Sequence, residues 1–199
     1  FSQVTNPPID SLRENKVMSL KTRFGNLGNI LDFDTLTKEN IYVLNSPILS
    51  NSQFNKFINF FGKNSVLIEC TFSRKENLFN SIRRIQKEAE IAVRQGATQL
   101  ILSDKEISLD KLPMPMLLCV GAINTFLIGK KLRGYVSINV QSGESLDTHS
   151  FATLIGVGAT TVNPYLAFDS LYQRYSKKLF GQFSFDECVQ RYIKSVNAG

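Results

Sequence analysis

Hydrophobic and polar positions repeat in a fixed order along residues 65–164, where a short apolar run is followed each time by a longer helical stretch. Four apolar runs predict strands at residues 66–70, 99–102, 135–140 and 159–162. The stretches between them are long enough for crossover helices, which join parallel strands in a right-handed sense. The pattern therefore predicts an α/β fold with a mostly parallel sheet, crossover helices and a partial (β/α) TIM-barrel-like arrangement.

Capping signals and apolar periodicity locate the helices. A capping box at Ser73 is expected to open the first crossover helix, and Gly96 to end it. Residues 116–131 are apolar almost throughout, which predicts burial on most sides. A second capping box, at Ser184, predicts a final helix. Shorter helices are expected at residues 146–157 and 165–175.

The length and composition predict a single domain. A chain of 199 residues with 43% hydrophobic content can build one substantial core. We expect residues 1–64 to form an N-terminal lead-in segment and residues 65–199 to form the βα-repeat body. Because the sequence starts at Phe1 rather than methionine and stops as a helix ends, we interpret it as a piece excised from a larger polypeptide.

The net charge of +6 and the pI of about 9.3 raise the possibility of a nucleic-acid partner. The basic residues are dispersed, however, and cluster where predicted helices end, a position that the helix dipole favours. Aromatic residues are not interleaved with them as in a single-strand binding groove. We therefore predict no nucleic-acid binding and keep a basic nucleic-acid-binding module as a third hypothesis.

Cysteine usage and hydropathy argue against a metal site and a membrane span. The three cysteines are far apart, and His149 is the single histidine that could join them. Reduced thiols are typical of a reducing compartment. The apolar stretch 114–128 is interrupted by Pro115 and Gly121 and is shorter than the roughly 20 residues that a bilayer requires. No membrane association and no metal-binding residue are predicted.

Candidate chemistry lies directly after the predicted strands, where parallel α/β folds bind ligands. Asp104 and Glu144 could act as general acid and base, and Asn163 follows the last strand. Structural roles for the same residue types, such as helix capping, are favoured. Cys70 and His149 are likewise expected to be structural. A stand-alone small α/β enzyme with a site at the strand carboxyl ends remains the alternative function.

A series of ordered segments carries a resemblance to a known family. The strongest runs from Gln3 to Glu14 and includes Asn6-Pro7-Pro8-Ile9-Asp10, and others include Ser142-Gly143-Glu144 and Ala159-Thr160-Thr161-Val162-Asn163-Pro164. The chain resembles the central domain of glutamate synthase nearly from end to end. It departs from the family pattern at His149-Ser150, where a His-His pair is usual, and at Val157, where tyrosine is usual.

The resemblance implies a parent enzyme that makes glutamate from glutamine and 2-oxoglutarate. One flanking domain would be a glutamine amidotransferase, and the other would hold FMN and a 3Fe-4S cluster. The central domain would be noncatalytic, connect the two and help form an ammonia tunnel, so that no catalytic, cofactor-binding or metal-binding residue carries over to this fragment. Thr5 and Asn6 are the candidate ammonia-channel residues.

The resemblance also implies partners and a location. The electron donor would be ferredoxin or an NAD(P)H-dependent reductase subunit, and ferredoxin is favoured by the segment around His149. The bias towards Asn, Lys, Ile and Phe agrees with an AT-rich plastid genome. We therefore expect the plastid stroma, with the cytoplasm as the alternative.

Overall fold

The computed structural model describes residues 19–25 and 41–199. The chain divides into two compact units, Phe1–Pro47 and Ile48–Gly199. Within the first, β1 (Thr22–Phe24) pairs antiparallel with β2 (Tyr42–Leu44). The elements discussed below all belong to the second unit.

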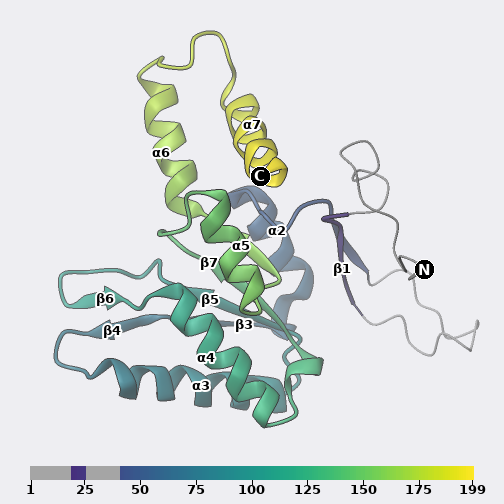
Figure 1. The fold of residues 1–199 in the computed structure, drawn as a ribbon, viewed down its shortest axis with the longest axis vertical. Helices are drawn as coiled ribbons and strands as arrows, with labels where there is room; N and C mark the ends of the chain where they lie inside the picture. The colour runs from purple at the N-terminus through teal and green to yellow at the C-terminus, as the bar shows by residue number, and fades with distance from the viewer. Residues whose placement is uncertain (1–18, 26–40) are drawn as a thin grey trace, which may run out of the picture. The chain divides into compact units, whose positions relative to one another are not determined.

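A four-stranded parallel sheet forms the centre of the second unit (Figure 1). Its strands are β3 (Ser65–Glu69), β5 (Gln99–Ser103), β7 (Ser137–Gln141) and β8 (Thr161–Asn163), and their spatial order follows the chain. Each predicted strand overlaps an observed one, so the α/β prediction is confirmed. Among the described residues the sheet stays open and does not close into a barrel.

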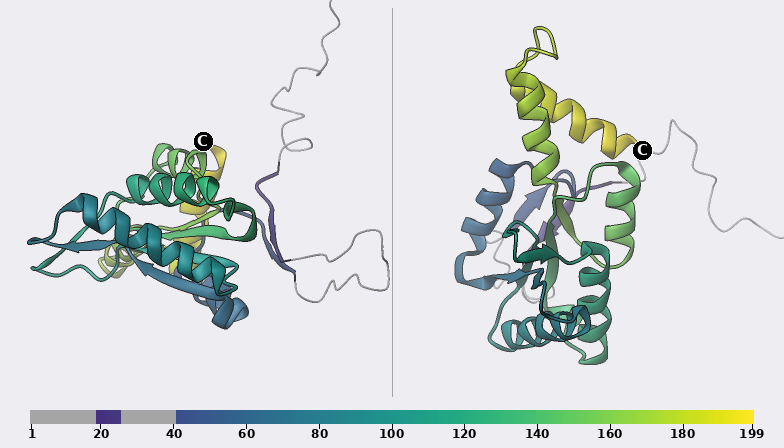
Figure 2. Two further views of the ribbon diagram at one scale, coloured as in Figure 1. Left: turned by 90° about the horizontal axis from the view of Figure 1, so that it is seen from below. Right: turned by 90° about the vertical axis from the view of Figure 1, so that its left-hand side faces the viewer.

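The two faces of the sheet are covered by different helices. Residues such as Ile68, Leu102 and Val140 point into the main hydrophobic core, together with side chains from α3 (Leu78–Arg94), α4 (Met116–Gly129) and α5 (Thr148–Gly156). On the opposite face lies α2 (Asn51–Phe61), as Figure 2 shows. Its buried Phe54 and Phe57 are not members of that core. The core face of the sheet is thus covered by several helices, and α2 lies on the other face.

One capping prediction is wrong. The helix α3 begins after Asn77, whose side chain accepts a hydrogen bond from the Phe79 N–H, and not after Ser73. Ser73 is instead the last residue of the short strand β4 (Thr71–Ser73). Asparagine is as good an N-cap as serine, and strand pairing holds Ser73. The predicted end is confirmed, because Gly96 has a φ of +96° just beyond the helix.

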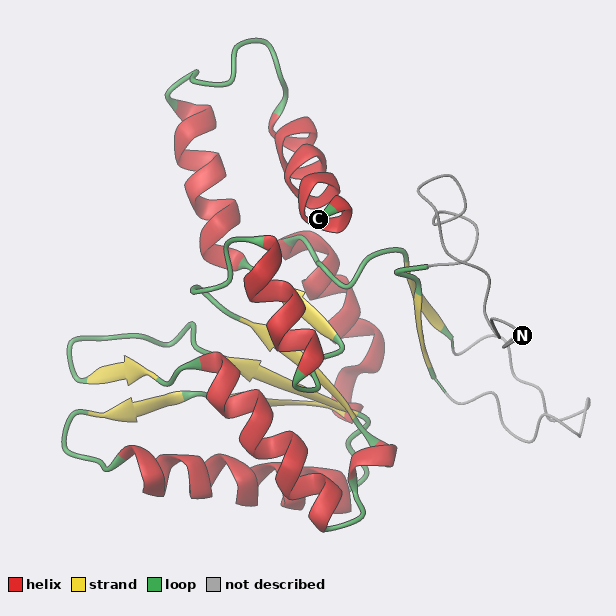
Figure 3. Cartoon of the chain, viewed as in Figure 1, coloured by secondary structure: helices red, strands yellow, loops and turns green. Residues whose placement is uncertain are grey.

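A pair of short strands extends beyond the sheet (Figure 3). The strand β4 pairs antiparallel with β6 (Lys111–Pro113), which places Phe72 opposite Leu112. The Met114 N–H donates to the carbonyl oxygen of Cys70 at 2.9 Å and continues the pairing. The sequence pattern did not indicate these strands, since β6 has too few residues to show an alternation of apolar and polar positions.

The last two helices, α6 (Tyr165–Ser176) and α7 (Phe185–Ala198), lie side by side (Figure 1). Phe168 and Tyr192 meet edge to face across them, with ring centroids 5.7 Å apart. The predicted capping box at Ser184 is confirmed, with Glu187 as its partner. The short 3₁₀ turns Gly62–Asn64 and Arg133–Tyr135 precede β3 and β7.

Residues 48–64 pack with the sheet. The Leu49 N–H donates to the carbonyl oxygen of Val162 at 2.9 Å, and Ile48 forms a parallel bridge with Val162. The segment predicted as a lead-in therefore contributes its last part to the same compact unit as the body. That residues 1–199 form one domain stays a prediction. No described helix is both long and apolar enough to cross a bilayer.

Candidate functional site

A row of hydrogen-bonded polar side chains crosses the sheet at the carboxyl ends of three strands. Ser103, Gln141 and Asn163 are register partners on β5, β7 and β8. Ser103 Oγ donates to Gln141 Oε1 at 2.8 Å, and Gln141 Nε2 donates to Asn163 Oδ1 at 3.2 Å. The buried Asn163 then donates from Nδ2 to Asn51 Oδ1 and to the carbonyl oxygen of Leu49, both at 2.9 Å. Asn163 thereby ties the row to the start of α2.

Asp104, the first candidate acid or base, holds a turn together. It is 3% exposed. Its Oδ2 accepts a hydrogen bond from Ser142 Oγ at 2.9 Å, and the Gly143 N–H lies 3.0 and 3.1 Å from its two carboxylate oxygens. Burial raises the pKa of this carboxyl, although the hydrogen bonds from Ser142 and Gly143 act in the opposite direction. Both oxygens are therefore occupied by the chain itself.

Tyr165 closes the other side of this turn. Its hydroxyl faces Asp104, and burial together with the charge of that carboxylate raises the pKa of Tyr165 to about 12. A Cβ placed on Gly143 would lie 2.9 Å from the Tyr165 hydroxyl oxygen. A larger residue at position 143 would therefore require the Tyr165 side chain to shift, so Tyr165 packs closely against the Ser142-Gly143-Glu144 segment.

Glu144, the second candidate, serves a different helix. Its Oε1 accepts a hydrogen bond from the Met116 N–H at 2.6 Å. Met116 opens α4, and the preceding Pro115 supplies no side-chain cap. A carboxylate at this position satisfies an unpaired amide and complements the helix dipole. Asp104 and Glu144 thus each accept hydrogen bonds from backbone amides, as a structural role requires, and that neither is catalytic stays a prediction.

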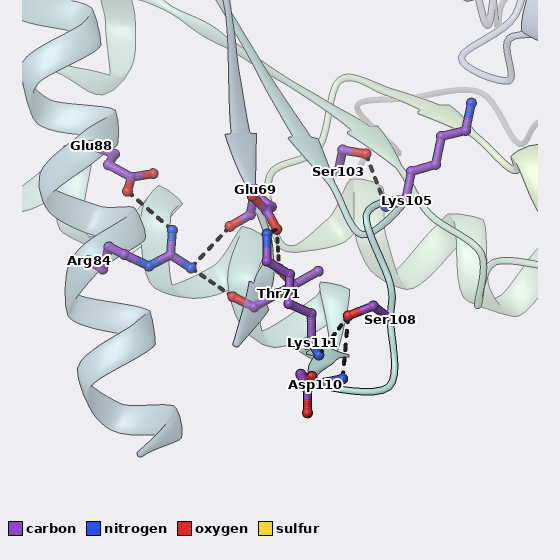
Figure 4. A network of polar contacts seen from close by, with 9 residues as sticks. All are labelled: Glu69, Thr71, Arg84, Glu88, Ser103, Lys105, Ser108, Asp110 and Lys111. Carbon is purple, nitrogen blue, oxygen red and sulfur yellow. Dashed lines mark hydrogen bonds and ion pairs between the residues drawn. The ribbon is translucent and has the colours of Figure 1, made fainter. Parts of the chain in front are cut away.

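A second polar network lies at the end of β3 (Figure 4). Lys111 Nζ lies 2.8 Å from Glu69 Oε1, and Thr71 Oγ1 donates to the same oxygen at 2.6 Å. The hydrogen bond from Lys111 lowers the pKa of Glu69, with a further contribution from Thr71. These contacts hold the β4–β6 pair against the end of the sheet.

Arg84 completes this network from α3. Its Nη2 donates to the carbonyl oxygens of Thr71 at 2.7 Å and Glu69 at 3.2 Å, while its Nη1 reaches Glu88 Oε1 at 3.1 Å. A pocket of about 310 Å³ is lined by Glu69, Thr71, Phe72, Ser73, Glu76, Arg84 and Lys111. Glu69 and Lys111 pair with each other inside it, and the Arg84 guanidinium holds the turn from β3 to β4 through the two carbonyl oxygens.

The buried thiols are not arranged as ligands. Cys70 and Cys119 are fully buried, and Cys70 Sγ donates to the carbonyl oxygen of Ile68 at 3.7 Å. The neighbouring Cys119 thiol and burial raise the pKa of the Cys70 thiol. Cys188 lies on α7. No group of three or more His, Cys, Asp or Glu side chains that could hold a metal ion occurs within residues 19–25 and 41–199. His149 is exposed in the first turn of α5.

The sequence did not predict several of these contacts, and two of its candidate residues lie outside the described part of the chain. The candidate channel residues Thr5 and Asn6 lie outside the described residues. The clamp by Arg84 was missed, because on the sequence it is one cation on the polar side of a helix, 13 residues from Thr71. Asn163 was expected directly after the last strand, and the structure adds its hydrogen bond from Gln141 on the neighbouring strand.

The comparisons with known proteins agree with one another. A family model described as "Glutamate synthase central domain" matches residues 1–199. The NADPH glutamate synthase large chain of Azospirillum brasilense is 47% identical over 202 residues, and that of Bacillus subtilis is 41% identical over 201 residues. The chloroplastic ferredoxin-dependent glutamate synthase of Spinacia oleracea is 37% identical over 214 residues. All of this chain is covered in each case, but it spans 13% of each relative's length.

Proposed function

The chain belongs to the glutamate synthase central domain family, and on that basis we propose that it is a noncatalytic connector within a glutamate synthase. The whole protein would make glutamate from glutamine and 2-oxoglutarate. A glutamine amidotransferase domain would release ammonia, and an FMN and iron–sulfur domain would carry out the reduction. This chain would join the two and form part of the ammonia tunnel.

The observation that carries the noncatalytic role is the occupancy of the strand ends. Asp104 accepts from Ser142 and Gly143, Glu144 caps α4, and Asn163 bonds Leu49 and Asn51. A general acid or base must reach the proton that it transfers, whereas the side chains of these residues form their hydrogen bonds with other groups of this chain. The raised pKa of Asp104 would suit proton transfer, but its burial and its partners support a structural role.

The residues of this chain do not fit the iron–sulfur cluster of the proposed whole protein. Such clusters are held by converging cysteine thiolates. Here Cys70 and Cys119 form a buried pair with a raised Cys70 pKa, and no site of three ligands occurs in the described part of the chain. The proposal therefore assigns the cluster and FMN to other parts of the whole protein and derives no step from them here.

The tunnel role is proposed for the segment around Thr5 and Asn6. Ammonia must stay unprotonated and apart from bulk water, which favours a stiff, neutral lining. The sequence Val4-Thr5-Asn6-Pro7-Pro8 is uncharged, and its two prolines restrict the backbone. The competing interpretation is a taut linker.

Bulky substitutions in the whole protein test the tunnel. Thr5→Phe or Asn6→Phe should lower glutamine-dependent glutamate synthesis, while synthesis from added ammonia and the bound flavin are retained. The measurement is glutamate formed per glutamine hydrolysed. Asn55→Phe, at an exposed position of α2, is the matched control and should leave the ratio unchanged. Full coupling in both tunnel variants would refute the assignment.

The electron donor is a separate proposal for the whole protein. Sequence features around His149 favour ferredoxin. The alternative is a pyridine-nucleotide donor, which the higher identity to the two bacterial NADPH chains supports. The alignments with these chains also need fewer gaps, since they extend over 202 and 201 residues against 214 for the Spinacia protein, and this chain has 199 residues. Glutamate formation driven by reduced ferredoxin or by NADPH, measured on one preparation, separates the two donors.

A plastid location is proposed together with the ferredoxin donor. The Spinacia and Oryza relatives are named as chloroplastic, whereas the Azospirillum and Bacillus relatives are bacterial proteins. Immunolocalisation of the whole protein in its own cells tests the plastid stroma against the cytoplasm.

A further inference from the structure

The helix α4 carries an exposed face without any charge. Leu117, Leu118, Gly121, Thr125 and Ile128 fall within roughly 100° of the helical circle, given 3.6 residues per turn, and we call them the α4 outer face. Leu117, Leu118 and Ile128 are 43%, 44% and 57% exposed. The opposite side of the helix is buried in the main core. Within the second unit the α4 outer face is therefore exposed.

The neighbouring helix α3 shows what solvent exposure requires in this layer. It packs against α4, and its outward positions include Arg83, Lys87 and Arg94. Residues 112–129, by contrast, contain no Asp, Glu, Lys or Arg, although 20% of the whole chain is charged. A helix that is apolar all round is normally buried. The sequence of α3 is therefore typical of a helix exposed to solvent, whereas the sequence of α4 is typical of a buried helix.

Gly121 gives a second, independent observation. It lies in the middle of α4, where glycine costs up to about 1 kcal/mol relative to alanine. A Cβ at this position would meet no atom within 4 Å, and its φ is not positive. Nothing in the described part of the chain therefore requires glycine there. Glycine in a helix permits the close approach of another backbone, and none of the described residues makes that approach.

We propose that the α4 outer face docks against an uncharged, apolar surface of a flanking part of the same longer polypeptide. The chain spans 13% of the length of its relatives, so most of such a protein lies outside this chain. The inference rests on the proposed connector function, because a connector must offer fixed contacts to its neighbours. The interface places leucine and isoleucine side chains around Gly121, where the partner backbone comes closest.

Cysteine labelling of the whole protein tests this interface. Leu118→Cys reports on the α4 outer face, and Ile91→Cys on α3 is the matched control, since the two side chains are 44% and 45% exposed in this chain. The native Cys70, Cys119 and Cys188 are buried. Both variants are treated with a maleimide at native conditions, and the modified peptides are quantified by mass spectrometry. Leu118→Cys should react at least about tenfold more slowly than Ile91→Cys.

A third variant makes the test specific. Adding Gly121→Leu to Leu118→Cys should bring the labelling rate up towards that of Ile91→Cys, because the added side chain holds the partner backbone away. Equal rates for Leu118→Cys and Ile91→Cys without Gly121→Leu would overturn the proposal. Protection of Leu118→Cys that disappears on dilution would also overturn it, because the cover would then be a second copy.

The labelling does not depend on turnover. Protected Leu118→Cys in a protein whose glutaminase and synthase activities are uncoupled would refute the connector function and leave the interface standing. Coupled activities together with a freely reactive Leu118→Cys would refute the interface and leave the connector function standing.

Discussion

The guanidinium of Arg133 donates from Nη2 to the carbonyl oxygen of Gly158 at 2.9 Å, which joins the turn before β7 to the turn before β8. Its Nε donates to Asn124 Oδ1 at 2.7 Å, and its Nη1 donates to the carbonyl oxygen of Val136. One half-buried cation therefore links α4 and two loops at the amino ends of the strands. Burial lowers the pKa of Arg133. The three oxygens, from Asn124, Val136 and Gly158, accept hydrogen bonds from its guanidinium.

Replacing Arg133 should destabilise the fold. Arg133→Ala leaves the oxygens of Asn124, Val136 and Gly158 without their donor, so we expect a loss of about 1–3 kcal/mol in the free energy of unfolding. Urea denaturation followed by circular dichroism measures it. Arg94→Ala removes an exposed ion pair with Glu90 and should change little. Equal effects of the two variants would contradict the linking role.

Two glycine substitutions should have opposite signs. Gly158 has a φ of +123°, and a Cβ there would lie 2.6 Å from Asn124 Cγ, so Gly158→Ala should cost at least about 1 kcal/mol. Gly121→Ala meets no atom within 4 Å and should stabilise chain 1–199 by up to about 1 kcal/mol. Thermal unfolding of the two variants and the parent chain gives both signs. Destabilisation by Gly121→Ala would show that α4 is packed differently.

Asp104 should make stability depend on pH in the direction opposite to a salt-bridged acid. Its pKa is raised above 3.8 in the folded chain, so the folded state binds the proton more tightly than the unfolded state. The stability that Asp104 contributes is then greatest below pH 3.8 and falls as the pH rises through the folded pKa. Each unit of pKa shift corresponds to about 1.4 kcal/mol.

Asp104→Asn removes this titration. The unfolding free energy of the parent chain minus that of the variant should therefore decrease from pH 3 upwards and become constant above the folded pKa. Urea titrations at a series of pH values measure the difference, with the exposed Asp110→Asn as control. A difference that increases with pH would mean that the bonds from Ser142 and Gly143 outweigh burial.

Glu144 should matter for stability and not for chemistry. Glu144→Ala leaves the Met116 N–H uncapped and should cost about 0.5–2 kcal/mol of unfolding free energy. Glu144→Gln keeps an acceptor oxygen and should cost less. In the whole protein, glutamate synthesis per folded molecule should be unchanged in both. Loss of turnover at full occupancy of the folded state would instead favour a catalytic Glu144.

Local pattern was sufficient for the elements of the sheet and most of its helices. The apolar runs found β3, β5, β7 and β8, because strands buried on a helix-covered face must be apolar wherever they lie. The predicted start of α3 failed, since Ser73 and Asn77 are both good N-caps and only the pairing of β4 with β6 chooses between them. Such a choice depends on Lys111, 38 residues later.

The sequence by itself determined the fold class, the family and the polar character of the strand ends. The tertiary structure alone decided what those polar groups do. Asp104 meets Ser142, and Gln141 meets Asn163, only because parallel register brings distant strand ends together. Hydrogen bonds join atoms within about 3 Å, and linear spacing carries no information about that distance until the chain is folded.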